Sequence, residues 1–135
     1  MKSVDVYGRP VFKSILRIAE EQRLPIHWGS KGFSLNVEVD GKDVALCYAY
    51  PPHAVYRQSI YTAFADITRK IEDGGEVVDV FRERIGELRV FTRAGNELKW
   101  IIEDEVDNNV IDRLNHIILD IALIMTTHGL ILKET

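Results

Sequence analysis

The 135-residue chain has one cysteine, no excess of positive charge and no long apolar run. A single cysteine, Cys47, excludes an intrachain disulfide and a zinc site built from cysteines, and it suits a reducing compartment. The net charge of -4 disfavours broad electrostatic capture of nucleic acid or anionic lipid. The longest apolar run, Ile117–Met125, is interrupted by Asp120 and reaches about half of a membrane span. We therefore expect a cytoplasmic protein without a membrane segment, and the amino end lacks the apolar core of a signal peptide.

The overall composition is that of an ordinary globular protein. Hydrophobic residues make up 46% of the chain and charged residues 28%, which argues against disorder and low complexity. A chain of this length can bury a core without disulfides or metal. No internal repeat or linker divides the sequence, so we expect one domain over residues 1–135.

The first half of the chain predicts a helix followed by a hairpin. Pro10 suits the first turn of a helix that continues to about Arg23. Phe33–Val39 alternates apolar and polar residues, which is typical of a half-buried strand, and Asp40-Gly41 suits a two-residue turn. The next strand, Val44–Tyr50, has no polar alternation, so we expect it to be central and covered on both faces.

A second helix is predicted after the proline pair that ends this strand. It runs from Ala54 or Val55 to Asp73, with Gly74 as its C-terminal cap. Glu76–Gly86 fits both a helix and a strand, and its helical spacing favours a short helix.

The last third of the chain predicts a second hairpin and a final helix. The hairpin strands are Leu88–Thr92 and Glu97–Ile102, joined by a turn that contains glycine and asparagine. Asp107 or Asn108 can cap the last helix, which reaches about His128.

This order of elements indicates an α+β fold. It reads helix, two or three strands, one or two helices, two strands and helix, so an antiparallel sheet built from two hairpins should carry the helices. The layout resembles that of the small acidic type III secretion chaperones. The resemblance implies a homodimer that binds another protein, without catalysis and without a cofactor.

The final helix has more apolar surface than one helix stripe requires. One stripe at helical spacing is complete in itself and consists of Val110, Ile111, Leu114, Ile117, Ile118, Ile121 and Met125. Leu119, Leu123 and Ile124 fall outside this stripe. Burying a second face requires a second partner, most simply another copy of the chain, so we expect a homodimer interface there.

A tyrosine-rich segment at the end of the central strand is the densest candidate for a binding site. Tyr50, His53, Tyr56 and Arg57 combine apolar rings with polar tips and a planar cation, which suits a ligand pocket or a partner interface. The alternative is that the tyrosines are ordinary strand residues and core edges.

The loop from Trp28 to Gly32 is a second candidate. Its glycines could present backbone amides to a phosphate, with Lys31 beside them. It also resembles the GxxG loop of KH domains, but that loop leads into a helix and Phe33–Val39 reads as a strand. The favoured interpretation is a turn that leads into the strand.

Glu97 and Lys99 resemble the short ExK signature of restriction-type nucleases, in which the carboxylate holds magnesium. The neighbouring strand, Leu88–Thr92, lacks the aspartate that this family also needs. A cross-strand ion pair between Glu97 and Arg93 is the more economical interpretation.

No metal site or common cofactor motif is predicted. The four histidines never occur three or four residues apart, and serine elbows, Walker loops and dinucleotide fingerprints are missing. Cys47 lies in an apolar strand, where a thiol is usually a small core residue.

Three functional hypotheses remain. The leading one is a non-enzymatic, homodimeric, protein-binding or chaperone-like module. The second is an enzyme: a metal-dependent nuclease, or a small-molecule enzyme that uses His53, Tyr56 and Arg57. The third and least favoured is a nucleic-acid-binding module, whose cations would be Lys31, Arg57, Arg69 and Lys70. The net negative charge disfavours nucleic acid as a partner, and the lack of a long apolar run disfavours a membrane.

Overall fold

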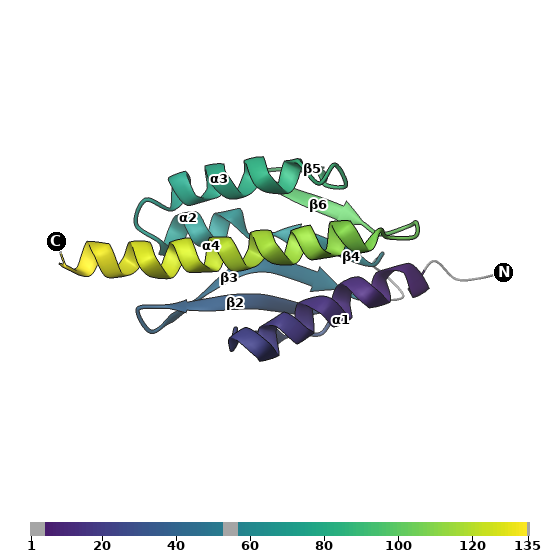
Figure 1. Ribbon diagram of the computed structural model, residues 1–135, viewed down its shortest axis with the longest axis horizontal. Helices are drawn as coiled ribbons and strands as arrows, with labels where there is room; N and C mark the ends of the chain where they lie inside the picture. The colour runs from purple at the N-terminus through teal and green to yellow at the C-terminus, as the bar shows by residue number, and fades with distance from the viewer. Residues whose placement is uncertain (1–4, 53–56, 135) are drawn as a thin grey trace.

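The computed structural model describes the backbone of residues 5–52 and 57–134, and the side chains of these ranges as far as residue 127 (Figure 1). In chain order the elements are α1 (Asp5–Gln22), β1 (Ile26–Trp28), β2 (Phe33–Val39), β3 (Lys42–Tyr50), β4 (Ser59–Thr62), α2 (Phe64–Lys70), α3 (Gly74–Gly86), β5 (Thr92–Ala94), β6 (Glu97–Ile101) and α4 (Asn108–Glu134). These helices and strands confirm the α+β class.

All six described strands form one antiparallel sheet in the order β1-β2-β3-β4-β6-β5. The two predicted hairpins are present as β2–β3 and β5–β6. They belong to the same sheet because β4 lies between them, with Ile60 opposite Ala49 of β3 on one side and opposite Trp100 of β6 on the other.

The first hairpin confirms the prediction from the sequence pattern. β2 spans the predicted residues, and its turn places Asp40 at φ 54° and Gly41 at φ 78°, as a two-residue turn between twisted strands requires. β3 is central, as predicted. Coverage on both faces holds for the fully buried stretch Val44–Cys47 but not for Tyr48 and Tyr50, which are half-buried.

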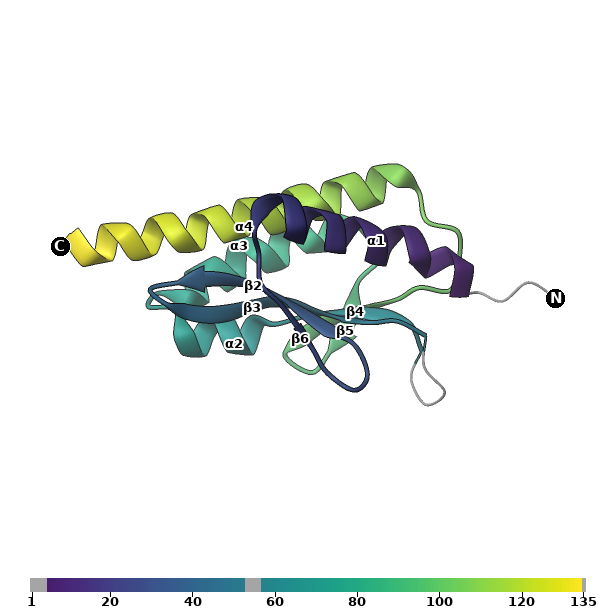
Figure 2. The same cartoon turned by 90° about the horizontal axis from the view of Figure 1, so that it is seen from below.

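The helices are distributed unequally over the sheet. In Figure 2, α1, α3 and α4 lie above the sheet, whereas α2 lies below it next to β3. The apolar stripe of α4 packs onto β2, α1 and α3, and its buried members include Leu114, Ile118 and Ile121. The core therefore lies between the sheet and the layer of α1, α3 and α4.

The second predicted helix is wrong in its first half. Ala54 and Val55 lie outside the described residues, and Ser59–Thr62 is a strand. The open edges of the two hairpins offer backbone partners on both sides of this segment, so pairing outweighs the helical spacing that the sequence suggested. The helix that follows, α2, is only seven residues long. Gly74 does not cap it but begins α3.

The region after α2 confirms one prediction and corrects another. Glu76–Gly86 is helical, within α3. The first strand of the second hairpin is displaced from its predicted position, because β5 spans Thr92–Ala94 and shares only Thr92 with the predicted Leu88–Thr92. Arg89 adopts a positive φ of 60°, which an extended strand does not allow, and Leu88 is buried in the turn that follows α3.

Both terminal helices are longer than predicted. α1 begins at Asp5, so Pro10 lies inside the helix instead of in its first turn. The missing N–H of Pro10 removes only the bond to the carbonyl of Val6, in the first turn of the helix. α4 continues past His128 to Glu134. Its predicted cap is confirmed, since the Asp107 carboxylate accepts a hydrogen bond from the Asn109 amide at 2.8 Å. Among the described residues, no helix has the length and apolar character needed to cross a membrane.

Candidate functional site

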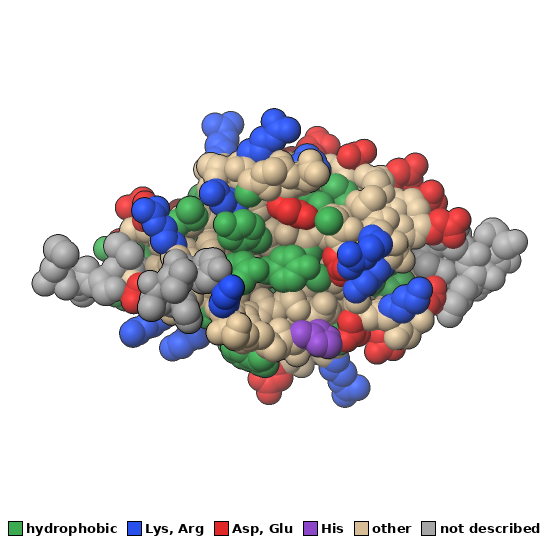
Figure 3. Space-filling model, turned by 180° about the vertical axis from the view of Figure 1, so that it is seen from behind, with side chains coloured by type: hydrophobic (Ala, Val, Ile, Leu, Met, Phe, Trp, Pro, Cys, Tyr) green, Lys and Arg blue, Asp and Glu red, His purple; other side chains and the backbone are tan. Residues whose placement is uncertain are grey.

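The face of the sheet opposite α1 and α4 carries a row of cross-strand neighbours. The register pairs Ser34 with Tyr48, Tyr48 with Tyr61, and Tyr61 with Lys99, so these side chains share one face. The residues that precede or follow them in the strands point to the opposite, covered face. Leu35 and Ile60 are two of these residues, and both are fully buried. Hydrophobic side chains gather across the middle of this face and charged side chains surround them (Figure 3). We call this surface the open face.

Tyr50, a predicted site residue, lies on the open face next to the row. Its ring meets that of Tyr61 edge-on, with 5.6 Å between the centroids and 86° between the planes. Edge-to-face geometry is the favourable arrangement for two aromatic rings. The contact fixes both side chains and leaves their outer surfaces half-exposed. Three of the five tyrosines, Tyr48, Tyr50 and Tyr61, are thereby brought together.

The predicted loop around Trp28 and Lys31 borders the same tyrosines. The loop and the strand residues beside it enclose a shallow pocket of about 350 Å³, lined by residues 27–34 together with Tyr48 and Tyr50. Trp28 leans on the buried ring of Phe33, with centroids 4.9 Å apart, yet 66% of its surface is exposed. Gly32 allows this arrangement, because a Cβ there would lie 2.1 Å from the Ala49 carbonyl oxygen. The structure thus joins two candidates that were separate in the sequence.

The interpretation of this loop as a turn is supported. The amide of Gly29 donates to the carbonyl of Gly32 at 2.7 Å, which closes the loop before β2 begins. This hydrogen bond satisfies the Gly29 amide inside the turn, so the amide does not point toward a phosphate. The strand that follows, in place of a helix, also removes the likeness to a KH loop.

Tyr48 is held in its neutral form. Partial burial is the main cause that raises its pKa above 10, and the negative charges of Asp66 and Glu97 raise it further. A neutral phenol can both donate and accept a hydrogen bond. The phenol of Tyr48, in the middle of the open face, is therefore uncharged at neutral pH.

The remaining members of the tyrosine-rich segment do not join this surface in the described structure. His53 and Tyr56 lie outside the described residues. Arg57 precedes β4 and pairs with Glu103 at 2.7 Å, with both side chains largely exposed. The Arg57 guanidinium is therefore bound by Glu103 at the end of the sheet.

Glu97 has a structural role that the sequence did not reveal. Its carboxylate accepts hydrogen bonds from the Thr62 hydroxyl at 2.7 Å and from the amides of Phe64 and Ala65 at 2.7 and 3.0 Å. These amides belong to the first turn of α2, where backbone donors lack partners within the helix. The predicted ion pair with Arg93 is wrong, because Arg93 stands opposite Leu98. With both oxygens bound by donors, Glu97 is poorly placed to hold magnesium.

The histidines and the cysteine contribute no reactive cluster in the described part of the chain. His27 Nε2 contacts the Asp43 carboxylate at 2.6 Å, and His116 contacts the carbonyl of Asp112 at 3.1 Å. No group of three potential metal-ligating side chains occurs among the described residues. Burial raises the pKa of the Cys47 thiol to about 12, so the thiolate is suppressed.

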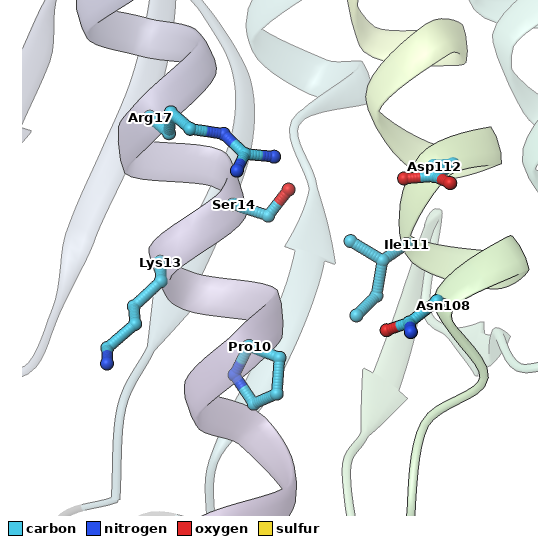
Figure 4. Close-up of a pocket in the computed structure, with 7 residues that line it drawn as sticks. All are labelled: Pro10, Lys13, Ser14, Arg17, Asn108, Ile111 and Asp112. Atoms are coloured by element: carbon cyan, nitrogen blue, oxygen red, sulfur yellow. The ribbon is translucent and has the colours of Figure 1, made fainter.

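A second hollow, which sequence reasoning missed, lies between α1 and α4. Its volume is about 510 Å³, and its lining residues are Pro10, Lys13, Ser14, Arg17, Asn108, Ile111 and Asp112 (Figure 4). Arg17 points across the gap toward α4, and Asp112 lies on the opposite wall. The mixed charges suit no single ion. The polar residue Ser14 within the apolar face of α1 was the one signal in the sequence.

The predicted dimer residues lie on the outer surface of α4. Leu123 is 64% exposed, Ile124 is 37% exposed and Leu119 is half-buried. The core stripe is buried independently of them, from Ile111 to Met125, with Val110 half-buried. The subunit itself therefore leaves this second apolar face uncovered.

No protein family, curated protein or solved structure was found to match the chain.

Proposed function

We propose that the protein is a non-enzymatic binding module that holds an apolar segment of a partner protein on the open face. The observation that carries this proposal is the clustering of Tyr48, Tyr50 and Tyr61 on the open face, where Tyr48 and Tyr50 also line the pocket that Trp28 borders. Tyrosine and tryptophan are enriched at protein interfaces because each offers a large apolar area with a polar tip. A chaperone-like role, in which the partner is held without being changed, agrees with this surface.

The size of the pocket indicates what part of the partner it receives. Ligand pockets that enclose a whole small molecule span about 300–1,000 Å³. The pocket beside Trp28, at about 350 Å³, is at the small end of that range and is open to solvent. It fits one large apolar or aromatic side chain, with the flanking backbone of the partner lying across the tyrosine row.

Catalysis finds less support than binding. Glu97 is engaged in capping α2, and Arg57 is engaged with Glu103. The thiol of Cys47 is buried and protonated. We include a cytoplasmic location in the proposal, because a chain with a single cysteine suits a reducing compartment.

Binding of nucleic acid is the main alternative, because aromatic side chains on an open sheet can also stack with bases. Arg57, Arg69 and Lys70 all have carboxylate partners. Arg69 and Lys70 contact Asp66 at 2.5 and 3.2 Å, and Arg57 contacts Glu103. Together with the net charge of -4, these pairs favour a protein partner.

A displayed library of random peptides tests the proposal. We expect selection on the wild-type protein to enrich peptides that share one large apolar or aromatic residue. Calorimetry with the synthesised consensus peptide should show binding that Trp28→Ala and Tyr50→Ala each weaken by about tenfold, or about 1.4 kcal/mol. Tyr7→Ala is the matched control, because Tyr7 lies on α1 and should leave the affinity unchanged.

Two results would contradict the proposal. One is a selection without enrichment, or a consensus peptide whose affinity does not depend on Trp28 and Tyr50. The other is tight binding of a fluorescent oligothymidine that requires the tyrosines and falls steeply with salt, which would favour the nucleic-acid alternative.

A further inference from the structure

An apolar ridge runs along the outside of α3 and α4, far from the open face. Among the described side chains, four large hydrophobic residues are strongly exposed, and three of them lie on these two helices. They are Val80 at 42%, Leu123 at 64% and Ile124 at 37% exposure. We call these three residues the ridge.

The ridge is continuous across the two helices. The Arg84 guanidinium of α3 and the Asp120 carboxylate of α4 form an ion pair of 2.8 Å, which fixes how the helices lie against each other. Figure 1 shows that α3 and α4 run in opposite directions. One turn before Arg84 is Val80, and one turn after Asp120 is Ile124, so these two residues fall at the same level of the antiparallel helix pair. Leu123, the residue before Ile124, lies about 100° around α4 from it and carries the apolar surface to the outside of the helix.

The carboxyl end of α4 strengthens the case for a missing partner. α4 has 27 residues and is therefore about 40 Å long. Its last turns project beyond the β2–β3 hairpin and beyond α3 in Figures 1 and 2. An isolated stretch of a few turns has little helical stability in water, because most helix stability in proteins comes from tertiary packing. A helix end that projects beyond the other elements of its own chain indicates a surface that another chain completes.

We propose that a second copy of this chain covers the ridge, with the two α4 helices packed antiparallel across a twofold axis. In such an arrangement the same surface of each copy contacts the other, so the ridge must be complementary to itself. Its apolar centre is complementary to itself because apolar side chains pack against each other. Its border is also complementary to itself, because Arg84 and Asp120 present both charges side by side and remain 35% and 51% exposed. A twofold copy therefore brings opposite charges within reach and creates no excess of one sign.

The projecting end of α4 offers contact beyond the three residues of the ridge. Specific interfaces bury about 800 Å² on each partner, which is more than three side chains provide. Antiparallel α4 helices would lay the projecting turns of each copy along the ridge of the other. A flat, unrelated partner would cover the ridge but leave the projecting end of α4 unsupported.

Measurement of the oligomeric state by light scattering tests this proposal. We expect twice the monomer mass at micromolar concentration. Leu123→Glu should raise the dissociation constant of the dimer at least about tenfold, because it places a carboxylate in the apolar centre. Trp28→Glu is the matched control, since Trp28 is as exposed as Leu123 but lies beside the open face. It should weaken peptide binding and leave the dimer intact, so the two proposals can fail separately.

Disulfide cross-linking tests the proposed dimer even if Leu123→Glu fails to fold. Single cysteines at Leu123 and at Thr127, one turn further along the exposed surface, bracket the proposed axis. The native Cys47 is buried and should not react. Mild oxidation should give a disulfide-linked dimer from at least one of the two variants, and none from Glu20→Cys on α1. A wild-type protein that stays monomeric, or a dimer that neither cysteine captures and Leu123→Glu does not weaken, would overturn the proposal.

Discussion

Asp66 of α2 accepts a hydrogen bond from the backbone amide of Ala45 in β3 at 2.8 Å. β4 pairs only with the second half of β3, from Cys47 to Tyr50. The first half of β3 would therefore expose its edge, and α2 lies against it instead. Lys70 of the same helix donates to the Asp43 carbonyl at 2.9 Å, so side chains of α2 replace the missing strand partner.

Removal of the Asp66 carboxylate should destabilise the fold. Asp66→Ala leaves the buried Ala45 amide without its acceptor, which costs about 1–3 kcal/mol in the free energy of unfolding. Urea unfolding followed by circular dichroism measures this change. Glu72→Ala, an exposed neighbour, should stay within about 0.5 kcal/mol of wild type. Equal effects of the two variants would show that the edge contact contributes nothing specific.

Glu97→Ala should cost more stability than Glu103→Ala. Glu97 satisfies two backbone amides and one hydroxyl at the start of α2, so its loss should cost about 1–3 kcal/mol. Glu103 forms an exposed pair with Arg57 that contributes no more than about 1 kcal/mol. Chemical unfolding of both variants gives the comparison. Unchanged stability of Glu97→Ala would instead favour a functional role for this carboxylate.

The buried thiol should make stability depend on pH at alkaline values. Burial raises the pKa of Cys47 from 9.0 in the unfolded chain to about 12, so the neutral thiol stabilises the fold below pH 9. This contribution is lost as the pH rises from 9 toward 12, by about 1.4 kcal/mol for each pH unit. Urea unfolding between pH 8 and pH 11 should therefore show a shallower loss in Cys47→Ala than in wild type. Parallel curves would mean that solvent reaches the thiol.

Ser14 and Asn115 form a buried polar pair between α1 and α4, and their substitutions should not be additive. The Asn115 amide donates to the Ser14 hydroxyl, and the Asn115 carbonyl oxygen has no hydrogen-bond partner among the described residues. Ser14→Ala alone should cost about 1–3 kcal/mol, because the amide loses its acceptor. The double variant Ser14→Ala, Asn115→Leu should recover most of this loss. A double-mutant cycle without coupling would contradict the pairing.

The candidate site was predictable in composition but not in arrangement. The sequence identified Tyr50, Trp28 and Lys31 as separate candidates, and the structure places their segments around one pocket. Tyr61 was assigned to a predicted helix, so its position opposite Tyr48 could not be foreseen. The segment Ser59–Thr62, with its β-branched and aromatic residues, was the available signal. It is only four residues long, too short to outweigh the helical spacing around it.

The sequence by itself determined the elements whose cause is local. The Asp40-Gly41 turn, the alternating strand before it, the Asp107 cap and the core stripe of α4 depend on residues a few positions apart. Steric limits on the backbone and the periodicity of side chains act over that range, so they can be predicted without knowing the neighbours.

Only the tertiary structure decided the position of β4 between the two hairpins and the partners of Glu97 and Asp66. These features depend on groups 20 or more residues apart in the chain. In each case the deciding factor is which strand edge or helix end still lacks hydrogen-bond partners once the rest of the chain has packed. That competition for hydrogen-bond partners exists only in the folded molecule.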